Sequence, residues 1–169
     1  MDALEAIFDR RSIRVYTGAP VTDDMLNTIL KAAMYAPSAV NKQPWHFIVF
    51  RDPEIIRKIV EIHPNAAMLS KAQVAVLVCW DEHQQHDTGY GPVDCAAATQ
   101  NMLLAAHSLG IGSVWIGIYP RQVRMEAMPS LFNLPAHIKA FSIVSLGYPA
   151  EQRTRPERFD AGKIHQEKW

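Results

Sequence analysis

The chain has little cysteine, no excess of either charge and no long hydrophobic run. Its only cysteines, Cys79 and Cys95, lie in an apolar and an alanine-rich stretch. Neither position suggests a disulfide framework, so a reducing cytoplasm is expected. The 17 basic and 17 acidic residues cancel, which removes the positive field on which nucleic-acid binding usually depends.

No segment has the pattern of a membrane span or a signal peptide. The longest strongly apolar run, from Val74 to Trp80, is far shorter than the roughly 20 residues that cross a bilayer. The chain opens Met-Asp-Ala-Leu-Glu, without a basic region followed by an apolar one. With 169 residues, 49% of them hydrophobic and 20% charged, residues 1–169 suit one globular domain. We therefore expect a cytoplasmic protein with neither a nucleic-acid nor a membrane partner.

Hydrophobic periodicity predicts helices and strands in alternation. Helices are expected over residues 3–9, after the N-cap candidate Thr22 until Pro37 stops the helix, from Asp52 onward, over 93–109 and over 123–131. Strands are expected over 46–50, 74–80, 113–118 and 140–146. The second helix should bury Met25, Leu26, Ile29, Leu30, Ala33 and Met34, and residues 81–92 should form a loop. The segment after Pro149 has no core pattern, so it is disordered or lies on another surface. Alternation alone favours a parallel doubly wound sheet.

Two arginine-rich segments lie at opposite ends of this neutral chain. Arg10, Arg11, Ser12 and Arg14 put three guanidinium groups and a hydroxyl within five positions, and the tail carries Arg153, Arg155 and Arg158. Guanidinium groups bind phosphate through two parallel hydrogen bonds, so these segments are candidates for a phosphate site. The competing interpretation is a solvated basic surface and a solvated tail, which short charge runs usually are.

Two further segments could contact a planar ring. The loop from Ala36 to Trp45 carries Pro37, Ser38, Asn41 and Gln43, and its amides offer donors and acceptors that suit a heteroaromatic edge. Gly117 stands among bulky apolar residues at a predicted strand end, where a flat group could approach closely. Separately, these features also fit a turn with a packed tryptophan and a strand-end glycine. Together with the arginines they suit a ligand with a phosphate at one end and a large ring at the other.

These segments resemble the FMN-dependent nitroreductase family. The resemblance runs from Leu4 to Trp169 and is carried by four motifs in order: Arg-Arg-Ser-x-Arg-x-Tyr from Arg10, Ala-Pro-Ser-x-x-Asn-x-Gln-Pro-Trp-x-Phe from Ala36, Gly110 to Gly117, and Leu146 to Pro149 followed by a basic tail ending Arg158-Phe159-Asp160. It implies an α+β fold in three layers, with a mainly antiparallel sheet between helices. It also implies a homodimer with FMN at the interface and a C-terminal segment extending onto the partner subunit. The family fold replaces the parallel default.

The resemblance also implies roles for individual residues. Arg10, Arg11, Ser12 and Arg14 would hold the phosphate, the ribityl chain and the N1/O2 edge of the flavin, while Arg158 and Arg155 would close over the phosphate. The backbone of Ile116, Gly117 and Ile118 would face N5 and O4. Pro37, Ser38, Asn41 and Gln43 would reach the flavin of the other subunit.

The implied activity is electron transfer from NADH or NADPH through FMN to a nitroaromatic, quinone or related small acceptor, in a ping-pong cycle. Because the cofactor carries the difficult chemistry and protons can come from water, no side chain is expected to be catalytic in the narrow sense. Arg14 is the candidate for stabilising the negative charge of the reduced ring. Alternatives are a flavin-binding module or sensor without turnover, or flavin reductase, dehalogenase or enal reductase chemistry on the same scaffold.

A metal site is a further alternative between Asp81 and Asp87. His83 and His86 stand three residues apart among acidic side chains, and divalent metals accept such ligands. The stretch is predicted to be a loop, and no third anchored group accompanies it. The sequence therefore predicts no metal.

Overall fold

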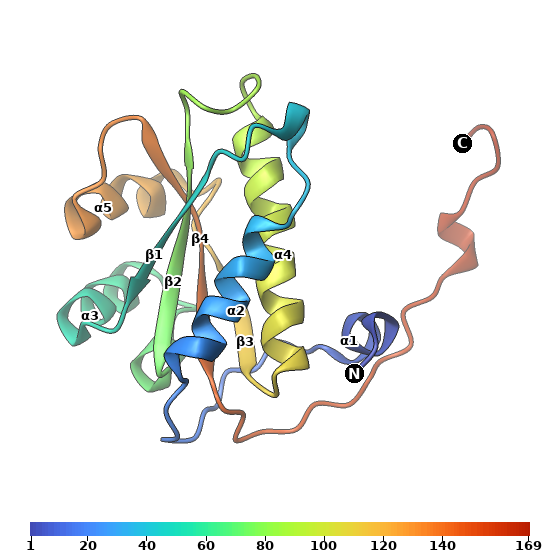
Figure 1. Cartoon of the computed structure of the whole chain (residues 1–169), viewed down its shortest axis with the longest axis horizontal. Coiled ribbons are helices and arrows are strands. Elements are labelled where there is room, and N and C mark those ends of the chain that lie inside the picture. The colour runs from blue at the N-terminus through green and yellow to red at the C-terminus, as the bar shows by residue number, and fades with distance from the viewer.

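Every neighbouring pair of strands in the central sheet is antiparallel. The computed structural model describes residues 1–169. Across the sheet the strands follow the order β1 (Trp45–Phe50), β2 (Val74–Asp81), β4 (Ile138–Gly147) and β3 (Gly112–Gly117) (Figure 1). This confirms the α+β expectation, and the parallel arrangement favoured by alternation alone is wrong. Alternation fixes the order of elements but not strand direction; here Phe50 pairs with Ala75, so β2 starts at the end of the sheet where β1 stops.

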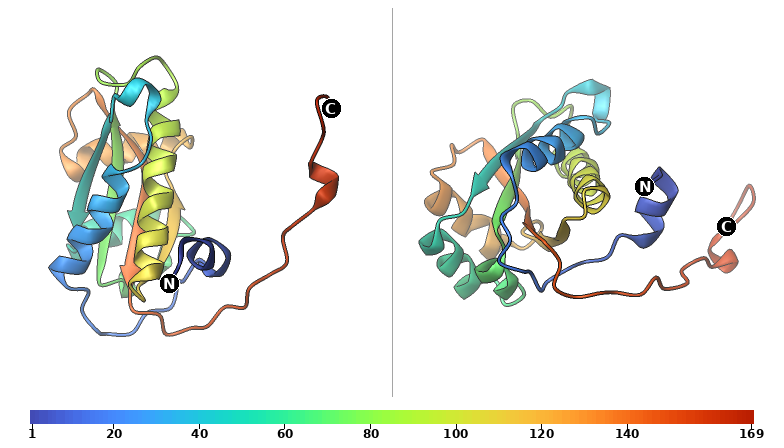
Figure 2. Two further views of the ribbon diagram at one scale, coloured as in Figure 1. Left: turned by 45° about the vertical axis from the view of Figure 1, so that its right-hand side comes forward. Right: turned by 60° about the horizontal axis from the view of Figure 1, so that its bottom comes forward.

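Helices cover both faces of the sheet. On one face lie α2 (Asp23–Met34) and α4 (Tyr90–Ser108); on the other lie α3 (Pro53–Ile62), the 3₁₀ helix η2 (Ala67–Lys71) and α5 (Gln122–Phe132) (Figures 1 and 2). Three short elements stand outside these layers: α1 (Ala3–Asp9), η1 (Ala39–Asn41) and η3 (Ala161–Lys163). The last of them lies in a C-terminal segment that leaves the body of the molecule (Figure 2).

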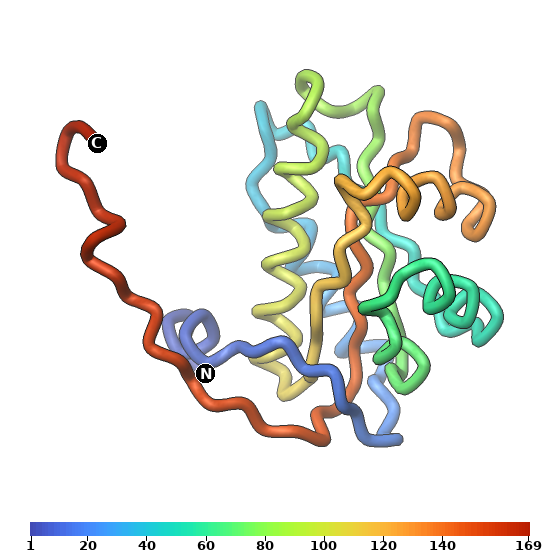
Figure 3. Tube along the Cα trace, turned by 180° about the vertical axis from the view of Figure 1, so that it is seen from behind, coloured from blue at the N-terminus to red at the C-terminus, as the bar shows by residue number.

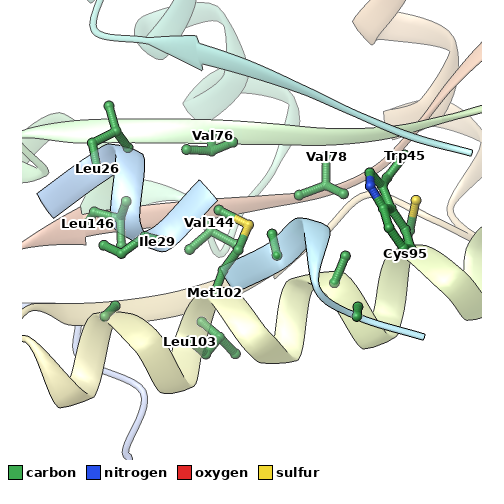
Figure 4. Packing of buried hydrophobic residues seen from close by; sticks show 14 of the residues in the cluster. Leu26, Ile29, Trp45, Val76, Val78, Cys95, Met102, Leu103, Val144 and Leu146 are labelled. Carbon is green, nitrogen blue, oxygen red and sulfur yellow. The ribbon is translucent and has the colours of Figure 1, made fainter. Parts of the chain in front are cut away.

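The sheet separates two hydrophobic cores because its central strand is apolar on both faces. All eight residues of β2 are buried, as the continuous valine-rich run predicts. Figure 4 shows the larger core, in which α4 contributes Met102 and Leu103 opposite Leu26 and Ile29 of α2. The smaller core lies under α3 and α5. Each layer of helices therefore packs on its own face of the sheet through a separate hydrophobic core.

Both cysteines lie in this interior as free thiols. The Cys95 thiol donates to the Cys79 carbonyl at 3.3 Å. Burial raises the pKa of Cys79 to about 12, and burial first, then Cys79 and Asp94, also raise the pKa of Cys95. Neither thiol is a ready nucleophile.

Two details of the expected helices are wrong. The helix predicted from about Val93 begins at Tyr90, after Gly89 with φ of 99°; Pro92 is tolerated because first-turn N–H groups have no partner within the helix. Met34, expected in the buried stripe of α2, is 52% exposed. The buried stripe of that helix runs through Leu26, Ile29 and Ala33, and Met34, one position further round the helix, points away from the core.

Gly91 is required where α4 meets β2. A Cβ built on Gly91 would stand 2.2 Å from Cδ1 of Trp80, which is far inside van der Waals contact. We expect Gly91→Ala to lower the free energy of unfolding by about 1–3 kcal/mol, as overpacking does, measured by urea unfolding. Without the clash, alanine at this helical position would instead raise the free energy of unfolding by about 0.5–1 kcal/mol. The sign of the measured change therefore shows whether the clash exists. Gly18→Ala, with nothing within 4 Å, is the control and should change stability little.

None of the helices combines the length and the apolar character needed to cross a membrane.

Candidate cofactor site

The N-terminal arm, residues 10–17, lies beside the edge strand β3. The N–H of Ile13 donates to the Ser113 carbonyl at 2.9 Å, and Ser12 forms a parallel bridge with Ser113. Figure 3 shows the arm crossing this strand. The Tyr16 hydroxyl donates to the Ile13 carbonyl at 2.7 Å and hydrogen-bonds Ser145 at 2.7 Å, and its burial raises the pKa of Tyr16 to about 12. The arm is therefore a fixed part of the sheet edge.

The start of the tail is tied to this arm. Glu151 accepts from the N–H groups of Arg14 at 2.6 Å and Val15 at 3.2 Å, and these bonds lower the pKa of Glu151. Arg155 lies over the ring of Phe8, 4.6 Å from its centroid, and pairs with Asp9 at 3.6 Å. The two arginine-rich ends of the chain therefore lie together.

The five candidate arginines fall into two groups by what their side chains do. Arg11 donates to the Thr154 carbonyl at 3.1 Å and to the Phe8 carbonyl at 2.6 Å, and Arg155 is held by α1 as described. The side chains of Arg10, Arg14 and Arg158 make no hydrogen bond or ion pair within the chain. Burial, with the positive charges of Arg11 and Arg158 added, lowers the pKa of Arg10. Arg10, Arg14 and Arg158, the three free arginines, are thus available to an anion.

A cavity of about 500 Å³ opens where the arm passes β3. Two of the predicted groups, Arg14 and the backbone of Ile116 and Gly117, line it, together with His63, Asn65, Met68, Trp115 and Arg124. Ligand cavities typically enclose about 300–1,000 Å³. Ile118 does not line the cavity; it is fully buried and its N–H donates to the Phe141 carbonyl at 3.1 Å.

Two side chains of the cavity wall donate hydrogen bonds to the Gly117 carbonyl. Asn65 N–H donates to Nδ1 of His63 at 3.2 Å, so Nε2 carries the proton and donates to the Gly117 carbonyl at 2.9 Å. Arg124 donates to the same carbonyl at 2.8 Å. Because the Ser113 and Gly117 carbonyls both point away from β4, strand alternation turns the N–H groups of Trp115 and Gly117 to the same side. An edge of backbone donors therefore faces the cavity.

The loop from Ala36 to Trp45, which carries the remaining predicted residues, lies at the end of the sheet remote from the arginine arm, beside the start of α4 (Figure 1). Ser38 Oγ accepts from Gln43 N–H at 2.9 Å, and Asn41 Oδ1 accepts from the Gln43 amide at 2.9 Å. Val40, Asn41 and Gln43 have φ of 51°, 56° and 51°, which non-glycine residues seldom adopt. Within one chain, Pro37, Ser38, Asn41 and Gln43 do not join the arginines.

A buried carboxylate anchors this loop. Asp94 is 3% exposed, and its Oδ1 accepts from Ala39 N–H at 3.0 Å. Its Oδ2 is buried without a hydrogen-bond partner. Strained backbone held by a buried group is typical of functional loops.

Sequence reasoning missed His63, Asn65 and Arg124. His63, Pro64 and Asn65 follow directly after α3 and look like an ordinary helix end, and Arg124 looks like a solvent-facing charge on α5. Each joins the site only because the helical layer of α3, η2 and α5 packs against the same face of the sheet as the cavity.

Known proteins match this chain over its whole length. The model of the nitroreductase family matches residues 7–63 and 63–148. A protein of Methanothermobacter thermautotrophicus, named as an NADH dehydrogenase/NAD(P)H nitroreductase, is 50% identical over 169 residues, which are all of this chain and 88% of that protein. A similarly named protein of Parabacteroides distasonis has a solved structure with a TM-score of 0.94 and 35% identity, covering 98% of both chains. A nitroreductase of Desulfovibrio desulfuricans solved with FMN has a TM-score of 0.85 and 31% identity, covering 100% of this chain and 99% of that one.

Proposed function

This chain belongs to the nitroreductase family, and we propose that it is an FMN-dependent NAD(P)H oxidoreductase. In this proposal residues 1–169 form one FMN-binding domain in the cytoplasm, where the free thiols stay reduced. The observation that carries it is the position of Arg14 at a cavity edged by backbone donors, with Arg10 on the same arm and Arg158 on the tail that is tied to this arm. A nitroreductase that is 31% identical is solved with FMN.

Residues of the cavity, the arm and the tail fit the parts of FMN. Arg10 and Arg158 offer unused guanidinium donors for the doubly charged phosphate. Ser12 and Asn65 offer a hydroxyl and an amide for the ribityl chain and the polar ring edge. Trp115 and Met68 give the cavity apolar walls. Arg11 and Arg155 support these groups by fixing the arm to the tail and α1.

Bound FMN would supply the hydride and electron transfer between a reduced nicotinamide and a second substrate. The fixed cation of Arg14, which lines the cavity, would stabilise the negative charge of a reduced flavin, because a preorganised charge needs no rearrangement. His63 and Arg124 hold the Gly117 carbonyl and thereby keep the backbone N–H groups of β3 aimed into the cavity. No side chain is assigned as an acid or base.

We propose that the working protein is a homodimer in which the loop with Pro37, Ser38, Asn41 and Gln43 completes the partner's site. The single chain leaves large apolar side chains exposed on α1 and the tail, with Leu4 61%, Phe8 46%, Phe159 76% and Trp169 101% exposed. Exposed apolar surface of this kind is typical of protein–protein interaction sites. The distance of the loop from the arginines of its own chain is explained if it serves a neighbour.

For the acceptor we propose a nitroaromatic, quinone or similar small molecule that alternates with NADH or NADPH in the same cavity. The segment between β2 and α4 is short, and Tyr90, the first residue of α4 and 44% exposed, is the aromatic group there that could cover a substrate.

The test is the cofactor and its reduction. We expect the purified protein to be yellow, to release one FMN per chain when denatured, and to lose flavin absorbance when titrated without air by NADH or NADPH. Reoxidation by a nitroaromatic or a quinone should follow. FAD, or no flavin even after FMN is added, contradicts the proposal. FMN that neither nicotinamide reduces would assign a binding module without turnover.

A further inference from the structure

Three side chains that can bind a metal meet at the end of the sheet remote from the arginine arm. Asp81 is the last residue of β2, His83 follows two residues later, and His137 immediately precedes β4. Each offers one ligand atom, and these three atoms all lie within 4.8 Å of one another. None of these residues takes part in the proposed flavin site.

Backbone pairing brings the three residues together. Asp81 pairs with Ile138 at the last position of the β2–β4 ladder. The N–H of Glu82 then donates to the His137 carbonyl at 2.9 Å, one step beyond the strands, and Asp81 N–H donates to the Pro44 carbonyl at 2.8 Å. The cluster is therefore fixed by the fold and does not depend on chance contacts of surface side chains.

The three side chains lie close to one another. Asp81 is buried, and one of its oxygens accepts from His83 N–H at 2.7 Å. The rings of His83 and His137 stack with centroids 4.6 Å apart and an interplanar angle of 10°. Zinc bonds of about 2.0–2.1 Å in a tetrahedron place donor atoms roughly 3.4 Å apart. Because His83 is exposed and His137 is half-buried, the His83 ring is free to turn out of this stack, so that a nitrogen of each ring points at one ion.

We propose that Asp81, His83 and His137 bind one divalent transition-metal ion of the zinc class, with water completing its coordination. Two imidazoles and one carboxylate suit zinc and its first-row neighbours better than calcium or magnesium, which prefer oxygen ligands alone. Lys139 does not oppose a cation here, because it is paired with Glu82 at 3.3 Å. The ion joins the segment after β2 to the turn before β4, and zinc, being redox-inactive, takes no electron from the flavin reaction.

The neighbouring histidine provides a matched control. His86 lies in the same segment, but its ring packs against Tyr90, 5.7 Å between centroids, and it is not in the cluster. Spacing in the sequence pairs His83 with His86, whereas the structure pairs His83 with His137.

The experiment uses the full chain without an affinity tag, freed of metal with a chelator, and titrates it calorimetrically with Zn²⁺. We expect one ion per chain, and Co²⁺ in its place should give the visible bands of a low-coordinate site. His83→Ala and His137→Ala should each weaken Zn²⁺ binding at least about tenfold, since even outer-sphere partners of metal ligands contribute about 10–100-fold. His86→Ala should leave Zn²⁺ affinity unchanged.

A thermal measurement separates lost binding from lost folding. Zn²⁺ should raise the unfolding temperature of the wild type and of His86→Ala but not that of His83→Ala or His137→Ala, because an ion that binds the folded state stabilises it. Without Zn²⁺ all four proteins should unfold at similar temperatures. No stoichiometric Zn²⁺ binding, equal affinity in the cluster variants, or a loss confined to His86→Ala would overturn the proposal. These readouts do not involve flavin, so the site stands or fails separately from the proposed activity.

Discussion

A chain cut after Pro149 is expected to lose FMN and the dimer together. The missing segment, residues 150–169, carries Arg158 beside Arg10 and Arg155 over Phe8. It also carries Glu151, which accepts two N–H groups of the arm that would hold the cofactor. The removed side chains of Phe159 and Trp169, 76% and 101% exposed in the single chain, have a surface to pack against only if another subunit covers them.

A second truncation separates the two effects. A chain ending at Asp160 keeps Glu151, Arg155 and Arg158 but lacks Ile164 and Trp169, so it should hold FMN more firmly than the shorter chain and dimerise less than the full one. Light scattering gives the mass, and flavin absorbance gives the occupancy. If the chain cut after Pro149 stays dimeric and keeps full flavin, the tail contributes to neither, and the proposed roles of Arg155 and Arg158 fail with it.

Local patterns predicted most of the scaffold because local physics determines it. The apolar run from Val74 to Trp80 is buried on both faces, and Thr22 caps α2 by accepting from Met25 N–H. Proline at position 53 starts α3, where its missing N–H has no partner to lose. Local patterns could not predict the direction of the strands, because the same alternation of helices and strands fits both a parallel and an antiparallel sheet. The antiparallel prediction came only from the resemblance to a family.

The candidate site was partly predictable for the same reason. Arg10, Arg14 and Gly117 belong to short contiguous motifs, so their chemistry is visible in the sequence. His63 and Arg124 meet only at the Gly117 carbonyl, which requires two separate helices to fold over one strand. His137 escapes detection as a partner of His83 because antiparallel pairing of β2 with β4 brings them together. The site residues that the sequence does not predict are therefore those that only long-range pairing brings together.

Arg10→Ala is expected to weaken FMN binding by about ten- to a hundredfold. The Arg10 side chain has no partner within the chain and stands beside the positive charges of Arg11 and Arg158. Three like charges held together without a counter-ion are costly, and a phosphate between them removes that cost. A hydrogen bond to a charged group contributes roughly 1.5–3 kcal/mol, which converts to the stated loss of affinity. Fluorescence quenching of FMN measures it.

Riboflavin identifies the phosphate as the group that Arg10 contacts. Riboflavin lacks the phosphate, so its affinity should be nearly the same for Arg10→Ala and the wild type, while the affinity for FMN falls. Arg51→Ala is the matched control, because Arg51 pairs with Asp23 on the surface at 3.3 Å and should affect neither ligand. Arg11→Ala should differ from both: it removes donors to the Phe8 and Thr154 carbonyls, so it should loosen the arm and weaken riboflavin and FMN alike. Equal FMN affinity in Arg10→Ala and wild type would return Arg10 to a solvated surface charge, and equal losses for both flavins would place its role in the ring site instead of at the phosphate.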